Sequence, residues 1–309
     1  MILENNNGIL KTVKEIEFKL EKDIQRLVEN NLSTLLSLEF IKSEFSIGQF
    51  RFDSVAYDNE SNSFVIIEYK KGKNESLVDQ GLTYLSTLLK RKADFVLLYN
   101  EVTKSSKGLK DFEWSQTRIV FISPKFTTYQ LNAASFKNLP FSFYEIKQFG
   151  NNCIEFNEIM AEKEETADFD LLPDIDSNIG KEINSEIKVY TEDDHLNAGN
   201  DFTRELYQEL RNRILQFGEI KIEPKKHYIA FKSKTNVCDV TIRQKNIIVA
   251  INLPKGKLVD NNKYAKIMKN DDGSKVGHWG NGDYQCALYD ENQIDYLITL
   301  IRQSYEANK

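Results

Sequence analysis

The sequence is poor in the residues that build zinc sites, disulfide frameworks and membrane spans. It contains three cysteines and three histidines, each set widely dispersed, and neither has the spacing of a metal site or a catalytic triad. The odd cysteine count indicates reduced thiols. No apolar run approaches the roughly 20 residues of a membrane span, and the first residues lack a basic segment followed by an apolar core. We therefore expect a cytoplasmic protein without a membrane segment.

Positive charge is also scarce, but only in one part of the chain. The net charge is −6, which taken alone disfavours nucleic-acid binding. Residues 151–200 hold 14 acidic and 3 basic residues, a net of −11. Residues 1–150 hold 20 basic and 19 acidic residues (+1), and residues 201–309 hold 18 and 14 (+4). A basic groove is therefore permitted on either flanking region, although the sequence does not establish one.

Length and composition indicate two globular domains. The chain has 309 residues, 40% of them hydrophobic and 28% charged, which suits about two domains. The polar, acidic stretch predicts a linker over residues 158–200, between a first domain at 1–157 and a second at 201–309. The elements expected in the first domain are helices at 9–36 and 77–91 and strands at 38–45, 49–57, 63–70, 95–99, 118–122 and 141–146. In the second domain we expect a helix that starts near residue 201 and another at 292–305. We also expect strands at 220–222, 228–231, 237–242 and 247–253, and a polar loop at 254–282.

Two acidic residues lie where one hairpin would bring them together. Strand patterns flank the polar turn at residues 58–62. If the hairpin is symmetric about this turn, Asp53 lies directly opposite Glu68, with Cβ atoms roughly 5 Å apart. Lys70 follows two residues later and shares that face.

Opposed carboxylates repel one another, and a divalent cation would reverse the sign of that interaction. Carboxylates suit Mg²⁺ or Mn²⁺. Lys70 could then orient or deprotonate a water, or steady developing negative charge. The alternative is a solvated, charged strand face of the kind many proteins carry.

The order of these residues resembles the PD-(D/E)xK nuclease superfamily, in its RecB-like, prokaryotic endonuclease-like branch. The resemblance implies an α/β fold with a restriction-endonuclease-like αβββαβ core. It implies Asp53 and Glu68 as ligands of Mg²⁺ or Mn²⁺ and as catalytic residues, together with Lys70 as the catalytic lysine and Gln80 lining the site. It covers about a third of the chain, and the matching segments are Glu21–Asn30, Leu38–Phe45, Arg51–Asp53, Ile67–Lys70 and Asp79–Tyr84.

Glu29 and Tyr84 are additional candidates. Tyr84 lies four residues after Gln80 on the same helix face, and the two resemble the Gln-x-x-x-Tyr motif of RecB-like nucleases; core packing is the alternative. Glu29 lies beside the apolar stripe of the leading helix. This position is consistent with an acid at the rim of the site and equally with an ordinary exposed glutamate. Gly81 would let its helix lie close to the sheet. Phe52 stands where the superfamily name has proline, a position that varies.

The C-terminal region, residues 202–305, resembles an uncharacterised bacterial domain often labelled "predicted transport protein". The absence of a membrane segment gives that label no support. We expect an accessory domain of smaller α+β type that serves substrate recognition or oligomerisation, through a homodimer or a protein partner.

Together these features predict a metal-dependent endo- or exodeoxyribonuclease that hydrolyses phosphodiester bonds in DNA, or in RNA, in defence or repair. The alternative is a catalytically inactive nuclease fold that acts as a nucleic-acid or protein binding and assembly module. The intact Asp-Glu-Lys set favours activity.

Overall fold

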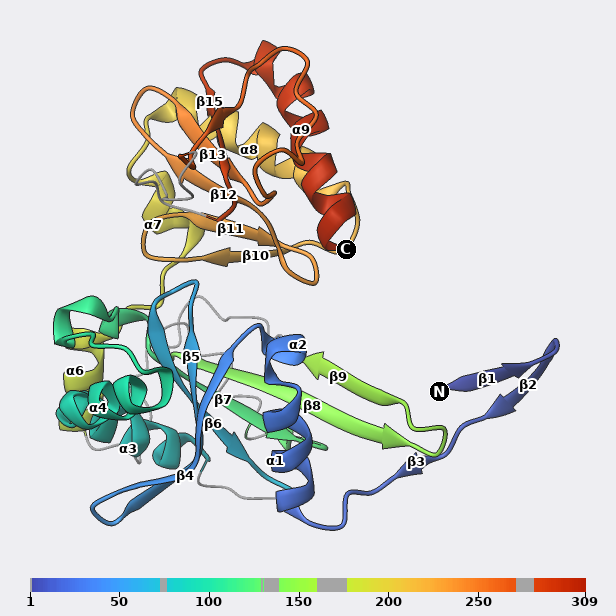
Figure 1. The fold of residues 1–309 in the computed structure, drawn as a ribbon, viewed down its shortest axis with the longest axis vertical. Coiled ribbons are helices and arrows are strands. Elements are labelled where there is room, and N and C mark those ends of the chain that lie inside the picture. The colour runs from blue at the N-terminus through green and yellow to red at the C-terminus, as the bar shows by residue number, and fades with distance from the viewer. Residues whose placement is uncertain (1, 73–76, 129, 131–138, 160–176, 271–280) are drawn as a thin grey trace. The chain divides into compact units, whose positions relative to one another are not determined.

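A computed structural model describes all residues except 1, 73–76, 129, 131–138, 160–176 and 271–280. Its contacts divide the chain into two units, residues 1–189 and 190–309 (Figure 1). The boundary lies inside the segment expected to be a linker. Residues 160–176 of that segment lie outside the described residues. Helix α6 (Ser177–Glu186), also in that segment, packs on helix α3 of the first unit.

The first unit has a mixed α/β fold, as expected. Its sheet has the strand order β3-β8-β7-β6-β5-β4, and β9 pairs with β8. Strands β6, β7 and β8 run parallel, and the other pairs run antiparallel. The strands are β3 (Glu15–Ile16), β4 (Glu39–Ile47), β5 (Phe50–Asp58), β6 (Ser63–Tyr69), β7 (Arg118–Ser123), β8 (Phe141–Phe149) and β9 (Ile154–Glu158). The helices are α1 (Glu21–Asn30), α2 (Leu32–Leu36), α3 (Leu77–Lys90) and α4 (Lys92–Thr103), with short 3₁₀ turns at Leu109–Asp111 and Trp114–Gln116.

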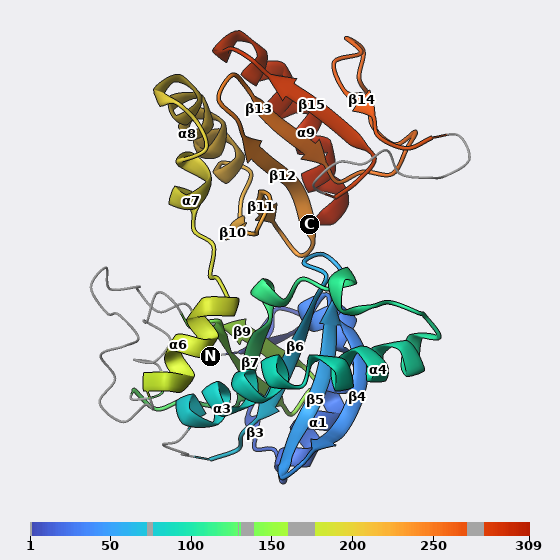
Figure 2. The ribbon, with the colours of Figure 1, turned by 90° about the vertical axis from the view of Figure 1, so that its left-hand side faces the viewer.

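Helices cover both faces of this sheet, and strand β6 lies at its centre. All seven residues of β6 are buried. Its alternate side chains enter two different cores: Phe64 and Ile66 pack with α3 and α4, whereas Val65 and Ile67 pack with α1 and α2. Figures 1 and 2 show α1 on one side of the sheet and α3 and α4 on the other. A strand covered on both sides needs apolar residues at every position, which explains the continuous apolar run.

The predicted hairpin register is confirmed. Ser54 pairs with Ile67, and Asp58 pairs with Ser63 across the turn. The same register continued by one pair sets Asp53 opposite Glu68.

The prediction of a helix over residues 9–36 is wrong for the N-terminal part of this range. The chain begins instead with a hairpin of β1 (Leu3–Asn6) and β2 (Ile9–Thr12), followed by β3, and the helix starts only at Glu21. Asn7 and Gly8 both have positive φ, at 55° and 86°. An Asn-Gly pair at such angles is the preferred two-residue hairpin turn, and this local chemistry outweighs the apolar spacing.

The strand expected at residues 95–99 is also wrong, because these residues lie in helix α4. Phe95, Leu98 and Tyr99 are buried, whereas Leu97 is 68% exposed. A spacing of three and four residues is that of one helix face. A short apolar run fits a buried strand or a helix equally well, and only the packing of α4 against β4 decides between them.

The second unit has a sheet of order β10-β11-β12-β13-β15-β14. Its core combines residues of the sheet with residues of α8 and α9. The segment 254–282, which was expected to be a loop, contains the short strand β14. Strand β15 follows this segment and was not predicted. The elements are α7 (Glu192–Leu196), α8 (Asp201–Leu215), β10 (Lys221–Pro224), β11 (Ile229–Lys232), β12 (Asn236–Ile242), β13 (Ile247–Ile251), β14 (Lys266–Ile267), β15 (Tyr284–Leu288) and α9 (Ile294–Asn308), with a 3₁₀ turn at Glu291–Gln293.

Candidate active site

Glu68 is the buried centre of a polar network at the end of β6. The residue is 2% exposed and lies on the α3 side of the sheet, in the same alternation as Phe64 and Ile66. Its Oε1 accepts hydrogen bonds from Lys70 Nζ at 2.7 Å and from Gln80 Nε2 at 2.5 Å. Its Oε2 is buried and has no hydrogen-bond partner among the residues that the structure describes. One carboxylate oxygen is therefore held by two donors, and the other is left for a further ligand.

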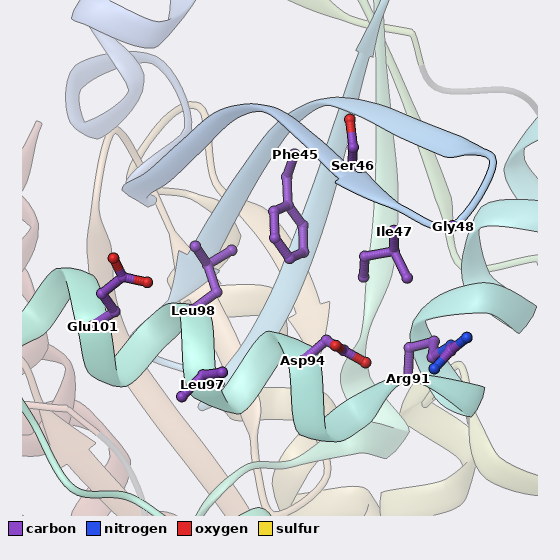
Figure 3. Close-up of a pocket in the computed structure, with 9 residues that line it drawn as sticks. All are labelled: Phe45, Ser46, Ile47, Gly48, Arg91, Asp94, Leu97, Leu98 and Glu101. Atoms are coloured by element: carbon purple, nitrogen blue, oxygen red, sulfur yellow. The ribbon is translucent and has the colours of Figure 1, made fainter.

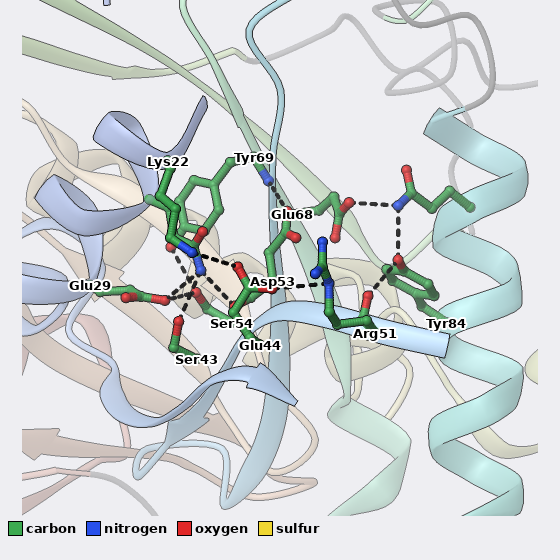
Figure 4. A network of polar contacts seen from close by, with 12 residues as sticks. Lys22, Glu29, Ser43, Glu44, Arg51, Asp53, Ser54, Glu68, Tyr69 and Tyr84 are labelled. Carbon is green, nitrogen blue, oxygen red and sulfur yellow. Dashed lines mark hydrogen bonds and ion pairs between the residues drawn. The ribbon is translucent and has the colours of Figure 1, made fainter. Parts of the chain in front are cut away.

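Asp53 reaches the same site from the neighbouring strand β5 (Figure 4). Its Oδ2 accepts a hydrogen bond from the backbone N–H of Tyr69 at 3.1 Å. That bond connects the Asp53 side chain to the residue between Glu68 and Lys70. The structure thus brings together Asp53, Glu68 and Lys70, the three residues that the sequence pattern selected.

Both carboxyl groups are costly to ionise in this site. Burial is the main cause that raises the pKa of Glu68 to about 7, and the negative charge of Asp53 is the second. Burial also raises the pKa of Asp53, although the Tyr69 N–H opposes that shift. A cation between the two groups would relieve both penalties at once.

Lys70 remains a cation in this arrangement. Burial alone would lower the pKa of its ammonium group, but attraction to Glu68 and the hydrogen bond to it outweigh burial and raise that pKa. An ammonium with a raised pKa is a poor proton acceptor near neutral pH. Of the roles considered for Lys70, stabilisation of negative charge is therefore favoured over deprotonation of water.

Helix α3 supplies Gln80 and Tyr84 to the network. Gln80 Nε2 also donates to Tyr84 Oη at 3.0 Å, and Tyr84 Oη donates to the backbone oxygen of Arg51 at 2.8 Å. The Tyr84 ring packs edge-on against Phe52, with centroids 4.8 Å apart. The Tyr84 ring therefore lies in the core, while its hydroxyl contacts Gln80.

Gly81 explains how α3 comes so near. A Cβ atom at this position would lie 2.6 Å from Phe141 Cζ and 3.0 Å from Phe121 Cζ, distances that need a neighbour to move. The expectation that this glycine permits a close approach to the sheet is confirmed.

Glu29 lies behind Asp53 in the network instead of beside Glu68. Its Oε1 accepts hydrogen bonds from Ser54 Oγ at 2.6 Å and from Gln25 Nε2 at 2.9 Å. Gln25 also donates to Ser43 Oγ at 3.0 Å and to the backbone oxygen of Asp53 at 2.9 Å. The sequence reasoning missed Gln25, which is 6% exposed. Its only sequence signal is an amide beside the apolar stripe of α1.

The donor set at Asp53 and Glu68 fits a hard divalent cation. Across the described ranges, histidine, cysteine, aspartate and glutamate form no group of three or more that could hold a metal. Mg²⁺, however, keeps several waters and is commonly bound by one or two protein carboxylates together with substrate phosphates. Two carboxylates, one with a buried oxygen that accepts no hydrogen bond from any described residue, meet that requirement.

No helix in the part of the chain that the structure describes is long and apolar enough to cross a membrane.

Comparison with known proteins places the chain in a family. A solved structure, "Structure of EndoMS-dsDNA2 complex", matches 44% of this chain and 50% of its own, with 15% identity and a TM-score of 0.24. Residues 192–308 match a family described as "Domain of unknown function (DUF5655)". A Haemophilus influenzae protein described as "Uncharacterized protein" is 43% identical over 309 residues, which is 98% of each chain. The chain therefore belongs to the same family as this Haemophilus influenzae protein, and its C-terminal unit is similar to DUF5655.

Proposed function

We propose that this protein is a metal-dependent nuclease that hydrolyses phosphodiester bonds in DNA. The observation that carries the proposal is Glu68: a buried carboxylate, ion-paired with Lys70 beside Asp53, whose Oε2 lacks a hydrogen-bond partner within the described residues. A buried polar atom without a partner costs about 1–3 kcal/mol. Groups held at such a cost, with strongly shifted pKa values, are typical of functional sites.

Each residue of the site has a role in this proposal. Asp53 and Glu68 would hold Mg²⁺ or Mn²⁺, which when bound would lower the pKa of water and polarise a phosphate oxygen. Lys70 would stabilise the negative charge that develops on the phosphate during attack. Gln80 donates a hydrogen bond to Glu68 Oε1, so that Oε2 would be the oxygen that holds the ion. Tyr84 in turn fixes Gln80.

The proposal is tested by incubating the purified chain with labelled single-stranded, duplex and modified DNA, and with RNA, in the presence of Mg²⁺, Mn²⁺ or a chelator. Cleavage of DNA should require the ion. Asp53→Asn should abolish cleavage and weaken Mn²⁺ binding measured by calorimetry. Lys70→Ala should retain Mn²⁺ binding but lose turnover by roughly 10²- to 10³-fold, because it removes charge stabilisation at the reacting phosphate. Lys71→Ala, a change to the exposed neighbouring lysine, is the matched control and should cleave normally.

Two results would contradict this assignment. Unchanged Mn²⁺ binding in Asp53→Asn would remove the metal site. Wild-type turnover in Lys70→Ala would assign the activity to another site. Metal and DNA binding without cleavage of any substrate would instead support the alternative, a nuclease fold used as a binding module.

The second unit is proposed as an accessory domain for substrate recognition or oligomerisation. Cleavage patterns of the full chain and of residues 1–189 on the same DNA test this role. Identical products and affinities would contradict a role in recognition.

A further inference from the structure

The β1–β2 hairpin is an arm whose apolar side chains face solvent. All eight residues of its two strands are exposed. Ile9 is 67% exposed, Leu10 60% and Leu3 41%. Figure 1 shows the hairpin extending away from the sheet beyond β3. A lone two-stranded hairpin is marginally stable in water, and clustered exposed apolar residues mark an interaction site.

The charges on this arm indicate a protein partner and disfavour nucleic acid. Over residues 3–12 the charged residues are Glu4 and Lys11, and they lie directly opposite each other across the hairpin. The arm is therefore neutral, whereas binding to a phosphate backbone depends on an excess of lysine and arginine. Glu4, Lys11 and Ile9 share one face, since Ile9 pairs with Asn6 two positions along the same strands.

A groove on the same unit is lined by apolar and charged residues that complement those of the arm. It has a volume of about 300 Å³ and lies between the end of β4 and helix α4. Phe45, Ile47 and Leu97 line its apolar part, and Leu97 is 68% exposed. Figure 3 shows Asp94 and Glu101 on helix α4, which borders the groove, and Arg91 at the N-cap of this helix. Its lining thus offers an apolar surface for Ile9, carboxylates for Lys11 and a guanidinium for Glu4.

The arm cannot fill the groove of its own chain. It is joined to β3 by two residues, Val13 and Lys14, and β3 and β4 lie at opposite ends of the strand order. Five strand spacings separate them, which is about 24 Å. The four-residue strands of the arm and the two linking residues together extend only about 20 Å. An arm that reaches such a groove must therefore come from another molecule.

We propose that the β1–β2 arm of one copy of this chain binds in the β4–α4 groove of a second copy. Ile9 packs on Leu97, Lys11 pairs with the acidic side chains at the groove, and Glu4 faces Arg91. A two-fold axis makes the exchange reciprocal, so that each copy contributes one arm and one groove. The inference does not depend on the proposed nuclease activity.

Sedimentation of the full chain tests the exchange. The wild type should form a dimer. Ile9→Glu and Leu97→Glu should each raise the dissociation constant by roughly ten- to a hundredfold, because each places a charge in an apolar contact. Val259→Glu is the matched control: Val259 is 66% exposed and lies on the second unit, so this variant should remain dimeric. All three side chains are exposed, so circular dichroism should show unchanged folding.

A charge-reversal mixture tests the pairing itself. Lys11→Glu should weaken the dimer, and so should the double variant Asp94→Lys, Glu101→Lys. An equimolar mixture of the two should recover a heterodimer, because each arm then meets a groove of opposite charge. The proposal is overturned if the wild type is monomeric up to about 100 μM, if Leu97→Glu dimerises like the wild type, or if the mixture stays monomeric.

Discussion

The buried carboxyl of Glu68 should make the first unit less stable as the pH rises from acid to neutral. Its pKa is raised from an ordinary 4.5 to about 7, first by burial and second by repulsion from Asp53. The folded chain therefore holds this proton more tightly than the unfolded chain. The stability contributed by the protonated carboxyl is complete below pH 4.5 and is lost progressively up to about pH 7. A shift of this size corresponds to about 3 kcal/mol.

Urea unfolding between pH 4.5 and 8 measures this effect in the wild type and in Glu68→Gln. The glutamine has a similar size but no titrating proton, so the difference in unfolding free energy between the two chains isolates Glu68. From pH 4.5 to pH 8, the unfolding free energy of Glu68→Gln should rise by about 3 kcal/mol relative to that of the wild type. The variant also removes the carboxylate that pairs with Lys70. This changes the unfolding free energy by the same amount at every pH, since Lys70 stays charged throughout. Glu39→Gln, a change to the exposed first residue of β4, is the control and should track the wild type.

Mg²⁺ should reverse the penalty only in chains that keep Glu68. An ion held by Asp53 and Glu68 stabilises the folded state by about 2.7 kcal/mol at a concentration one hundred times its dissociation constant. Glu68→Gln at pH 8 should gain much less from Mg²⁺, whereas Glu39→Gln should gain as much as the wild type. The reasoning is refuted if the free-energy difference between wild type and Glu68→Gln is independent of pH, or if Mg²⁺ stabilises Glu68→Gln as strongly as Glu39→Gln.

Three other features give independent predictions. Gly81→Ala should cost about 1–3 kcal/mol in urea unfolding, because the new Cβ would meet Phe141 Cζ at 2.6 Å; wild-type stability would contradict the close packing of α3. Lys107→Ala should cost about 1–2 kcal/mol, because its Nζ lies 4.8–5.3 Å from the centroids of three aromatic rings, whereas Lys110→Ala, an exposed control, should cost little. The fragment 190–309 should unfold cooperatively by itself, since it contains its own buried core; a broad, non-cooperative transition would show that it depends on the first unit.

The hairpin of the site could be predicted because its determinants are local. A polar turn between two apolar runs fixes the pairing, and the two-residue alternation of strands then places Asp53, Glu68 and Lys70. The predicted position of Gln80 follows from the resemblance to nucleases, and the structure joins Gln80 to Glu68. The same turn chemistry is present at Asn7-Gly8 and produces a hairpin. The apolar spacing of the residues that follow predicted a helix there instead.

The remaining site residue lay beyond sequence reasoning because its role depends on distant contacts. Gln25 touches Ser43 and the Asp53 backbone, 18 and 28 residues away. An amide on one helix carries no local sign of such partners. Strand β15 was missed for a similar reason, because it pairs with β13 across a long connection.

The sequence by itself determined the β5–β6 hairpin, its register and the charged residues it carries, since turn chemistry and side-chain alternation act within a few residues. Only the tertiary structure decided that residues 95–99 are helical and that one oxygen of Glu68 is buried without a hydrogen bond among the described residues. It also decided that β3, which carries the arm, and β4, which borders the groove, lie at opposite ends of the strand order. Burial, desolvation and strand order arise from packing between segments far apart in the chain. These are the quantities that turn a pair of carboxylates into a candidate active site.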